Sequence, residues 1–189
     1  MKLPQLYDVF RERWEQFGTA YLISDTHFGD KDLQANIKNR PNDEDYVKII
    51  NSKVGKNDLL ICVGDVGDIE IARRLKGYKV LIAGNHDTGM SNYKNVFDEV
   101  YSGPLMISEK IILSHEPVEV PWAMNIHGHV HWPGATGNAT HFNVCPDARK
   151  SFEPINFNQL IKNGIASHID SIHRLTIDSA TLNSLKRRK

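Results

Sequence analysis

The sequence predicts an α/β fold in which parallel strands end in polar loops. Short apolar runs, such as Asp58 to Val63 and Tyr78 to Ala83, are each followed at once by glycine, which fits buried parallel strands. Amphipathic segments with helical spacing, such as Asp43 to Val54, lie between the runs. Because open α/β sheets bind ligands beyond the carboxyl ends of their strands, the loops after these runs are the expected position of a functional site.

The composition fits one globular domain. A chain of 189 residues that is 40% hydrophobic can form one core but is too short for two full domains, so residues 1–189 are interpreted as a single domain. Lys plus Arg and Asp plus Glu both number 23, and the zero net charge gives no large field favouring a polyanion. The only basic run, Lys186 to Lys189, is interpreted as a solvated tail.

The cysteines and the absence of long apolar runs predict the compartment. Two cysteines are too few for a disulfide framework, and Cys62 falls inside the apolar run Leu59 to Val63, which is typical of a buried thiol in a reducing compartment. The first residues do not follow a leader pattern, and no apolar run approaches the length of a membrane span. We therefore expect a soluble, cytoplasmic protein with no membrane partner.

Periodicity and turn residues predict the individual elements in chain order. Helices are expected over residues 4–17, 43–54, 69–76, 156–163 and 169–185. Strands are expected over residues 19–24, 58–63, 78–83, 99–107, 110–114, 123–127 and 141–145. This divides the domain into an amino-terminal helix, a core over about residues 20–145 and a partly helical tail over about residues 150–189.

Five short motifs with metal-ligand side chains stand directly after apolar runs. They are Asp25-Thr26-His27, Gly64-Asp65-Val66-Gly67-Asp68, Gly84-Asn85-His86-Asp87, the single His115, and Gly128-His129-Val130-His131. On an extended segment, residues two apart point the same way, which would align Asp25 with His27 and His129 with His131. The glycines at positions 64, 84 and 128 should permit tight turns and a close approach of the backbone to a metal or phosphate.

In this order, the motifs resemble the signature of the calcineurin-like metallophosphoesterase superfamily: DxH, GDxxD, GNH[DE], an isolated His and GHxH. The match covers about residues 20–145, and the chain looks like a compact member of the bacterial or phage type. The resemblance implies an α/β/β/α sandwich, in which two packed mixed sheets are flanked by helices.

The resemblance also implies a binuclear metal centre. One metal would take Asp25, His27, Asp65 and His131, and the other Asp65, Asn85, His115 and His129. Asp65 would then bridge them, binding one metal with each carboxylate oxygen. Ligands with oxygen and nitrogen atoms and no thiolate suit two divalent transition metals, with manganese favoured and iron, zinc, nickel or cobalt as alternatives.

The same motifs imply further site residues. His86 would act as the general acid that protonates the leaving oxygen, and Asp68 would orient it. Arg40 is a candidate phosphate clamp because a guanidinium can bind two phosphate oxygens, although a solvent-facing surface arginine is the more ordinary interpretation.

The remaining histidines are expected outside the ligand sets. His127 precedes the glycine of the last motif, so packing or support of a ligand is favoured over ligation, and His141 is expected to be structural or at the rim of the site. His168 and His173 are interpreted as surface residues of the tail.

The expected function is hydrolysis of a phosphate ester. Ile69 and Glu70 follow Asp68 where the protein Ser/Thr phosphatases and symmetric dinucleoside tetraphosphatases carry Arg-Gly, so neither activity is expected. The resemblance implies a hydroxide between two metals that attacks a phosphodiester or phosphomonoester of a small molecule or nucleotide, with diesters favoured. A nuclease acting on DNA or RNA is the alternative, disfavoured by the neutral charge. A non-catalytic scaffold of the same fold is less favoured, because all the motif residues are present.

Overall fold

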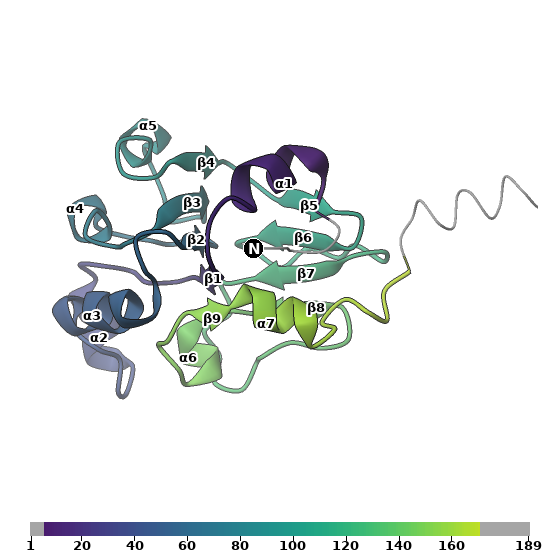
Figure 1. Cartoon of the computed structure of the whole chain (residues 1–189). Coiled ribbons are helices and arrows are strands. Elements are labelled where there is room, and N and C mark those ends of the chain that lie inside the picture. Colours follow the sequence, from purple (N-terminus) through teal and green to yellow (C-terminus); the bar gives the residue numbers. More distant parts are fainter. Residues whose placement is uncertain (1–5, 171–189) are drawn as a thin grey trace, which may run out of the picture.

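Two mixed β-sheets pack together and are flanked by helices in the computed structural model, which describes residues 6–170 (Figure 1). The strand order is β4-β3-β2-β1-β9 in the first sheet and β5-β6-β7-β8 in the second. Strands β1 to β4 are parallel and β9 is antiparallel to β1, while β6, β7 and β8 are parallel and β5 is antiparallel to β6. The expected sandwich of two mixed sheets is confirmed.

The bounds of the elements are as follows. The first sheet contains β1 (Ala20–Ile23), β2 (Leu59–Cys62), β3 (Tyr78–Ile82), β4 (Glu99–Tyr101) and β9 (Ile155–Asn156). The second contains β5 (Leu105–Ser108), β6 (Ile111–Ser114), β7 (Met124–His127) and β8 (His141–Asn143). The helices are α1 (Asp8–Trp14), α2 (Lys31–Asn36), α3 (Asp43–Lys53), α4 (Ile69–Ala72), α5 (Met90–Tyr93), α6 (Pro146–Arg149) and α7 (Phe157–Lys162). None of these helices has the length and apolar character needed to cross a lipid bilayer.

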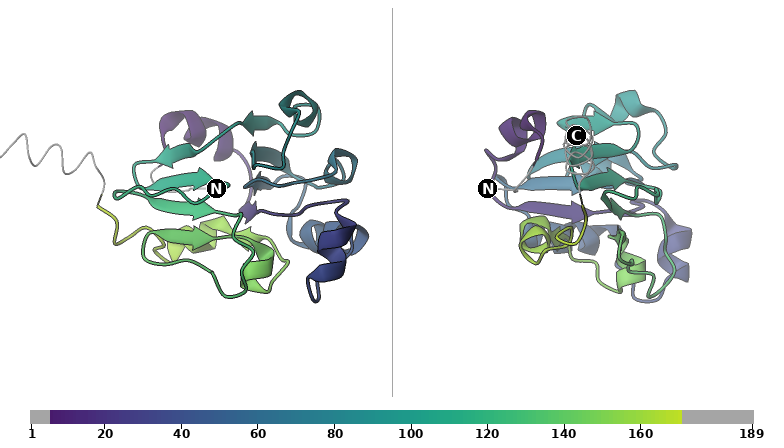
Figure 2. Two further views of the ribbon diagram at one scale, coloured as in Figure 1. Left: turned by 180° about the vertical axis from the view of Figure 1, so that it is seen from behind. Right: turned by 90° about the vertical axis from the view of Figure 1, so that its right-hand side faces the viewer.

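The first sheet is buried on both faces, which explains its continuous apolar runs. In β2, Leu59 and Ile61 belong to a core cluster shared with α1, α7 and the second sheet. Leu60 and Cys62 face the other way, into a cluster formed with α3, α4 and α5, which lie along one side of the molecule (Figures 1 and 2). Burial raises the pKa of the Cys62 thiol to about 12, as expected for an inert thiol in the core.

The second sheet has one apolar and one polar face. Ile111 and Leu113 point into the cluster shared with the first sheet. On the opposite face lie the buried polar residues Asn125, His127 and His141. The two imidazole rings are 5.7 Å apart between centroids, and Nε2 of His141 lies 3.2 Å from the carbonyl oxygen of Val118. Both histidines are thus packed into the structure, and neither is among the expected ligands.

Several element bounds differ from the sequence-based expectation. The single strand expected over residues 99–107 is two strands in different sheets, β4 and β5, because Gly103 and Pro104 interrupt it. Helix α1 begins at Asp8 because the preceding residue Tyr7 already donates its backbone N–H to the carbonyl of Ile107, 2.9 Å away. The helix expected over 69–76 ends at Ala72, and most of the helix expected over 169–185 lies outside the described residues.

Helix α1 is tied to the first sheet by the carboxylate of Glu99, whose side chain is only 8% exposed. The buried indole N–H of Trp14 donates to Oε1 of Glu99 at 3.0 Å, and the hydroxyl of Tyr78 donates to the same oxygen at 3.1 Å. The hydroxyl of Tyr101 donates to Oε2, which Arg13 also approaches at 3.4 Å. One carboxylate therefore satisfies four polar groups at the interface between helix and sheet.

Removing this carboxylate should destabilise the domain. Glu99→Ala leaves the donors of buried Trp14 and half-buried Tyr78 without an acceptor, and we expect the free energy of unfolding to fall by about 1 to 3 kcal/mol. Urea unfolding followed by circular dichroism measures the change. Glu12→Ala, on the exposed side of the same helix, is the matched control and should change stability by no more than about 0.5 kcal/mol. Equal stability of the two variants would contradict the proposed role of Glu99.

Candidate metal centre

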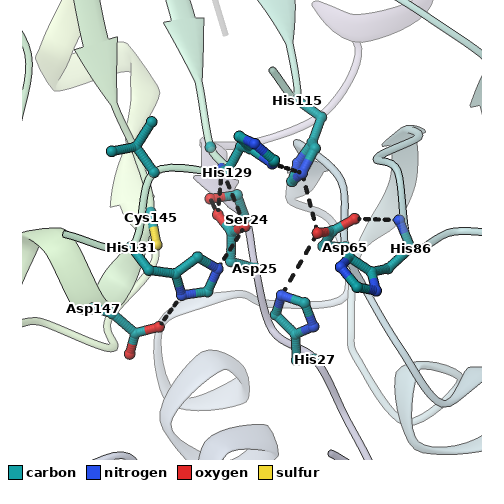
Figure 3. A network of polar contacts seen from close by, with 12 residues as sticks. Ser24, Asp25, His27, Asp65, His86, His115, His129, His131, Cys145 and Asp147 are labelled. Carbon is teal, nitrogen blue, oxygen red and sulfur yellow. Dashed lines mark hydrogen bonds and ion pairs between the residues drawn. The ribbon is translucent and has the colours of Figure 1, made fainter. Parts of the chain in front are cut away.

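The expected ligand residues follow strands of both sheets, and Figure 3 shows all of them except Asn85 gathered in one site. They follow β1 (Asp25, His27), β2 (Asp65), β3 (Asn85), β6 (His115) and β7 (His129, His131), and the expected acid His86 comes directly after Asn85. All five strands are parallel to a neighbouring strand of their own sheet, so their ends present the loops together. The predicted position of the motifs at strand ends is confirmed.

Three groups of side chains have ligand atoms within 4.8 Å of one another: Asp25, His27 and His131; Asp65, His115 and His129; His131, Cys145 and Asp147. The first two groups correspond to the two expected ligand sets. Asn85 adjoins the second group, with its Oδ1 3.1 Å from Nε2 of His115. The third group shares His131 and adds a thiol and a carboxylate that the sequence motifs do not contain.

Asp65 lies between the first two groups. Its Oδ2 is 3.6 Å from Nε2 of His27 and 3.1 Å from Nε2 of His115. Its Oδ1 accepts the backbone N–H of His86 at 2.9 Å. A single oxygen, Oδ2, therefore faces both groups, whereas the sequence led us to expect one oxygen for each metal.

The backbone at four ligand residues is left-handed. The φ angles are 50° at Asp25, 43° at His27, 53° at Asp65 and 67° at His129. The expectation that these side chains align on extended segments is therefore wrong. Backbone hydrogen bonds hold the turns instead, from Asp25 to Gly64 and from His27 to Asp65, both at 3.0 Å. Left-handed backbone costs about 1 to 3 kcal/mol per non-glycine residue and is concentrated at functional sites.

Two glycines make room for the ligands. A Cβ at Gly84 would lie 2.2 Å from Oδ1 of Asp65, and a Cβ at Gly64 would lie 2.3 Å from Nδ1 of His115. No side chain can be accommodated at such distances without moving the ligand. The glycines thus allow a close approach of these side chains, whereas the approach of the backbone to a metal or phosphate stays a prediction.

Asp87 organises two ligand loops, a role that the sequence did not reveal. Its buried carboxylate accepts the backbone N–H groups of Asp65 at 2.8 Å and Gly84 at 2.9 Å through Oδ2, and that of Val66 at 2.9 Å through Oδ1. It thereby joins the loop after β2 to the loop after β3. In the sequence, only its place beside His86 in the motif pointed to a role for Asp87. That position does not distinguish a metal ligand from a residue that holds the ligand loops.

Arg40 is a buried structural residue, and neither the phosphate clamp nor the surface arginine is correct. Its guanidinium donates to Oδ2 of Asp147 at 2.5 Å and to the carbonyl oxygens of Asp25 and Thr26 at 2.6 and 2.8 Å. Only 1% of the side chain is exposed, so it cannot bind a substrate phosphate from solvent. Oδ2 of Asp147 also lies 2.7 Å from Nδ1 of His131, which fixes the orientation of that imidazole.

The electrostatics of the site favour cation binding. Burial alone would raise the pKa of Asp25, but hydrogen bonds with His131 and Ser24 outweigh it and lower the pKa. Hydrogen bonds to Asp147 and Asp25 raise the pKa of His131 to about 12. Burial lowers the pKa of His27 and keeps it neutral, as a ligand must be.

The donor set fits divalent metals. Buried Nε2 of His27 has no hydrogen-bond partner among the described residues, and a buried nitrogen of this kind is expected to have one. Coordination of a metal would satisfy it. Carboxylate and imidazole groups from both groups converge on the same region, as a transition-metal centre requires (Figure 3).

His86 and Asp68 are not brought into contact. The exposed His86 lies at the edge of the site, with its ring centroid 5.3 Å from that of His27. Asp68 is also exposed, and its Oδ1 caps helix α4 by accepting the backbone N–H groups of Glu70 at 2.8 Å and Ile71 at 3.2 Å. Within residues 6–170, Asp68 makes no hydrogen bond to His86, and its orienting role stays a prediction.

A cleft opens at each end of the site. One, of about 630 Å³, adjoins the first ligand group and is lined in part by His131 and Asp147. The other, of about 280 Å³, adjoins the second group and is lined in part by Asn85 and His115. The site is therefore accessible from two sides.

Comparison with known proteins identifies similar structures. No protein-family model and no curated protein matches the sequence. A protein of unknown function from Aquifex aeolicus is similar with a TM-score of 0.63 and 26% identity, over 76% of this chain and 98% of that chain. The chain thus shares its α/β architecture with nearly the whole of that protein.

Two further solved structures are similar over part of their length. One is the nuclease MPE from Pseudomonas putida, with a TM-score of 0.44 and 23% identity over 59% of this chain and 61% of that chain. The other is Yfce, a phosphoesterase from E. coli, with a TM-score of 0.41 and 17% identity over 74% of this chain and 82% of that chain.

The bracing role of Asp87 can be tested by metal binding. In Asp87→Asn, the amide NH₂ would face backbone N–H donors, and we expect metal affinity to fall by about 10- to 100-fold, as is typical when a group supporting the ligands is lost. Titration with Mn²⁺ measures the change. Asp98→Asn is a matched control because Asp98 accepts the N–H of Lys79 at the opposite end of β3. Unchanged affinity in Asp87→Asn would contradict the role.

Proposed function

We propose that this protein is a metal-dependent phosphoester hydrolase with a binuclear centre. The observation that carries the proposal is the position of Asp65, whose Oδ2 faces an imidazole from each ligand group at 3.6 and 3.1 Å. Two divalent metals held by the two groups would activate water and neutralise the charge on the phosphoryl oxygens. Manganese is the first metal to test, because the donor set is oxygen and nitrogen.

The side chains of the site would have two roles, binding the metals and transferring a proton. Asp25, His27, Asp65 and His131 would hold one metal, and Asp65, Asn85, His115 and His129 the other. His86 is exposed at the edge of the site, with its backbone N–H fixed by Asp65, and from there its ring could give a proton to the leaving oxygen. Asp68 would stabilise the protonated ring if its free oxygen turns toward His86.

Phosphodiesters are the substrates that the shape of the site supports best. A diester carries two ester groups, and a cleft adjoins each ligand group. One cleft could hold the retained group while the other accommodates the leaving group. A monoester would use only one of them.

Metal binding and acid catalysis should separate in two variants. We expect Asp65→Asn to lose metal, because the shared carboxylate charge is removed, whereas His86→Ala should keep its metal. His86→Ala should hydrolyse alkyl phosphate esters at least about 100-fold more slowly than the wild type while losing much less on nitrophenyl esters, whose leaving groups need little protonation. Elemental analysis after incubation with manganese and steady-state rates on both ester types provide the readouts.

Two results would contradict these assignments. Fewer than about one metal ion per wild-type chain after incubation with excess manganese would show that the ligand groups are not a metal centre. Equal losses of rate on alkyl and nitrophenyl esters in His86→Ala would exclude His86 as the acid.

The preference for diesters can be measured directly. With manganese, hydrolysis of bis(p-nitrophenyl) phosphate should be at least as fast as that of p-nitrophenyl phosphate, because both ester groups of the diester find a cleft. Rates measured side by side at equal concentration test this. A strong preference for the monoester would overturn the diesterase proposal and leave the metal centre unaffected.

A further inference from the structure

An exposed tryptophan stands next to the metal centre. Trp132 directly follows the ligand residue His131, and 76% of it is exposed. Within residues 6–170, its indole stacks on no other ring and donates no hydrogen bond. A large aromatic side chain left in water beside a reactive site is typical of a surface that binds a ligand.

Trp132 forms one wall of the larger cleft. The volume of about 630 Å³ lies within the range of small-ligand sites, which is roughly 300 to 1,000 Å³. Ile37, Pro133 and Phe152 complete the apolar part of the wall, and His131 connects it to the first ligand group. A flat apolar group that enters this cleft would therefore reach the metal centre at one end.

The cleft also carries positive charge. Lys38 and Lys150 line it, both are exposed, and within the described part of the chain neither ammonium group has an ion-pair partner. Asp147 also lines the cleft, but its carboxylate is paired with the buried guanidinium of Arg40. Asn36 and Asn39 add amide groups that can both donate and accept hydrogen bonds. The aromatic wall, the unpaired lysine ammonium groups and the amides together suit a ligand that combines a planar heterocycle with an anionic group.

We propose that the larger cleft binds the nucleoside part of a phosphodiester, with the base stacked on Trp132 and the phosphate at the metal centre. This inference rests on the proposed function, since the metal centre must accept the phosphate. Stacking of a base on an aromatic side chain is tolerant of base identity, and the lysines add attraction for the anion.

The charges favour a single nucleoside over a long strand. Two lysines line the cleft, and the chain as a whole has no net charge. Proteins that follow a nucleic-acid backbone need clustered basic groups along its length. We therefore assign the cleft to a nucleotide-sized ligand.

Two synthetic diesters with the same leaving group test the assignment. Thymidine 5′-(p-nitrophenyl phosphate) and methyl p-nitrophenyl phosphate both release nitrophenolate and differ only in the retained ester group. With manganese, we expect kcat/KM to be at least about 10-fold higher for the thymidine ester. Trp132→Ala should bring this ratio close to one, whereas Trp122→Phe, which changes a half-buried tryptophan outside the lining of the cleft, should preserve it.

Binding can be measured without catalysis. Thymidine 5′-monophosphate added to the metal-free protein should quench tryptophan fluorescence because the base stacks on the exposed indole of Trp132. The quench should persist in Trp122→Phe and disappear in Trp132→Ala. Circular dichroism spectra like that of the wild type would show that both variants are folded.

The outcomes distinguish this inference from the function on which it rests. Quenching by the nucleotide without hydrolysis of either ester would refute the proposed function and support the nucleoside site. Hydrolysis of both esters at equal kcat/KM would overturn the nucleoside site and support the hydrolase. Tight binding of an oligothymidylate, together with no quench by the mononucleotide, would overturn the assignment and show that the cleft binds a nucleic-acid strand instead of a single nucleoside.

Discussion

Contact between the carboxylate of Asp65 and the imidazole of His115 couples the two sheets. Asp65 follows β2 in the first sheet and His115 follows β6 in the second, yet Nε2 of His115 lies 3.1 Å from Oδ2 of Asp65. This distance is maintained only if the sheets keep one packing arrangement. The cluster of apolar side chains that the sheets share with α1 and α7 therefore determines the geometry of the site, although none of its members is a ligand.

Buried charges are the second constraint on the site. Arg40 and Asp147 form an ion pair whose side chains are 1% and 2% exposed, and such pairs rarely increase stability over well-packed apolar residues. Here the pair has a positional effect, because Arg40 also holds the carbonyl oxygen of Asp25 and Asp147 also holds the ring of His131. Two candidate ligands of one group are thus oriented by a single arrangement of charges.

The sequence predicted those features that depend on local pattern. Apolar runs located the strands, and the motifs located the ligand loops at their ends. It failed where tertiary contacts decide: the division of residues 99–107 between two sheets, the burial of Arg40, and the contacts of Asp147 and Asp87 with distant loops. The left-handed backbone at Asp25 and His27 was also missed, because single non-glycine residues adopt it only where the surrounding hydrogen bonds require it.

The turn that carries the chain from one sheet to the other also shapes the smaller cleft. Ser102, Gly103 and Pro104 connect β4 to β5, and all three line that cleft beside Asn85. A side chain at Gly103 would meet no atom within 4 Å, so this turn can change in size and polarity without disturbing a ligand. If the proposed function holds, related proteins could thus diverge in the groups they accept on this side of the site while retaining the proposed chemistry, with three residues of a surface turn as the variable part.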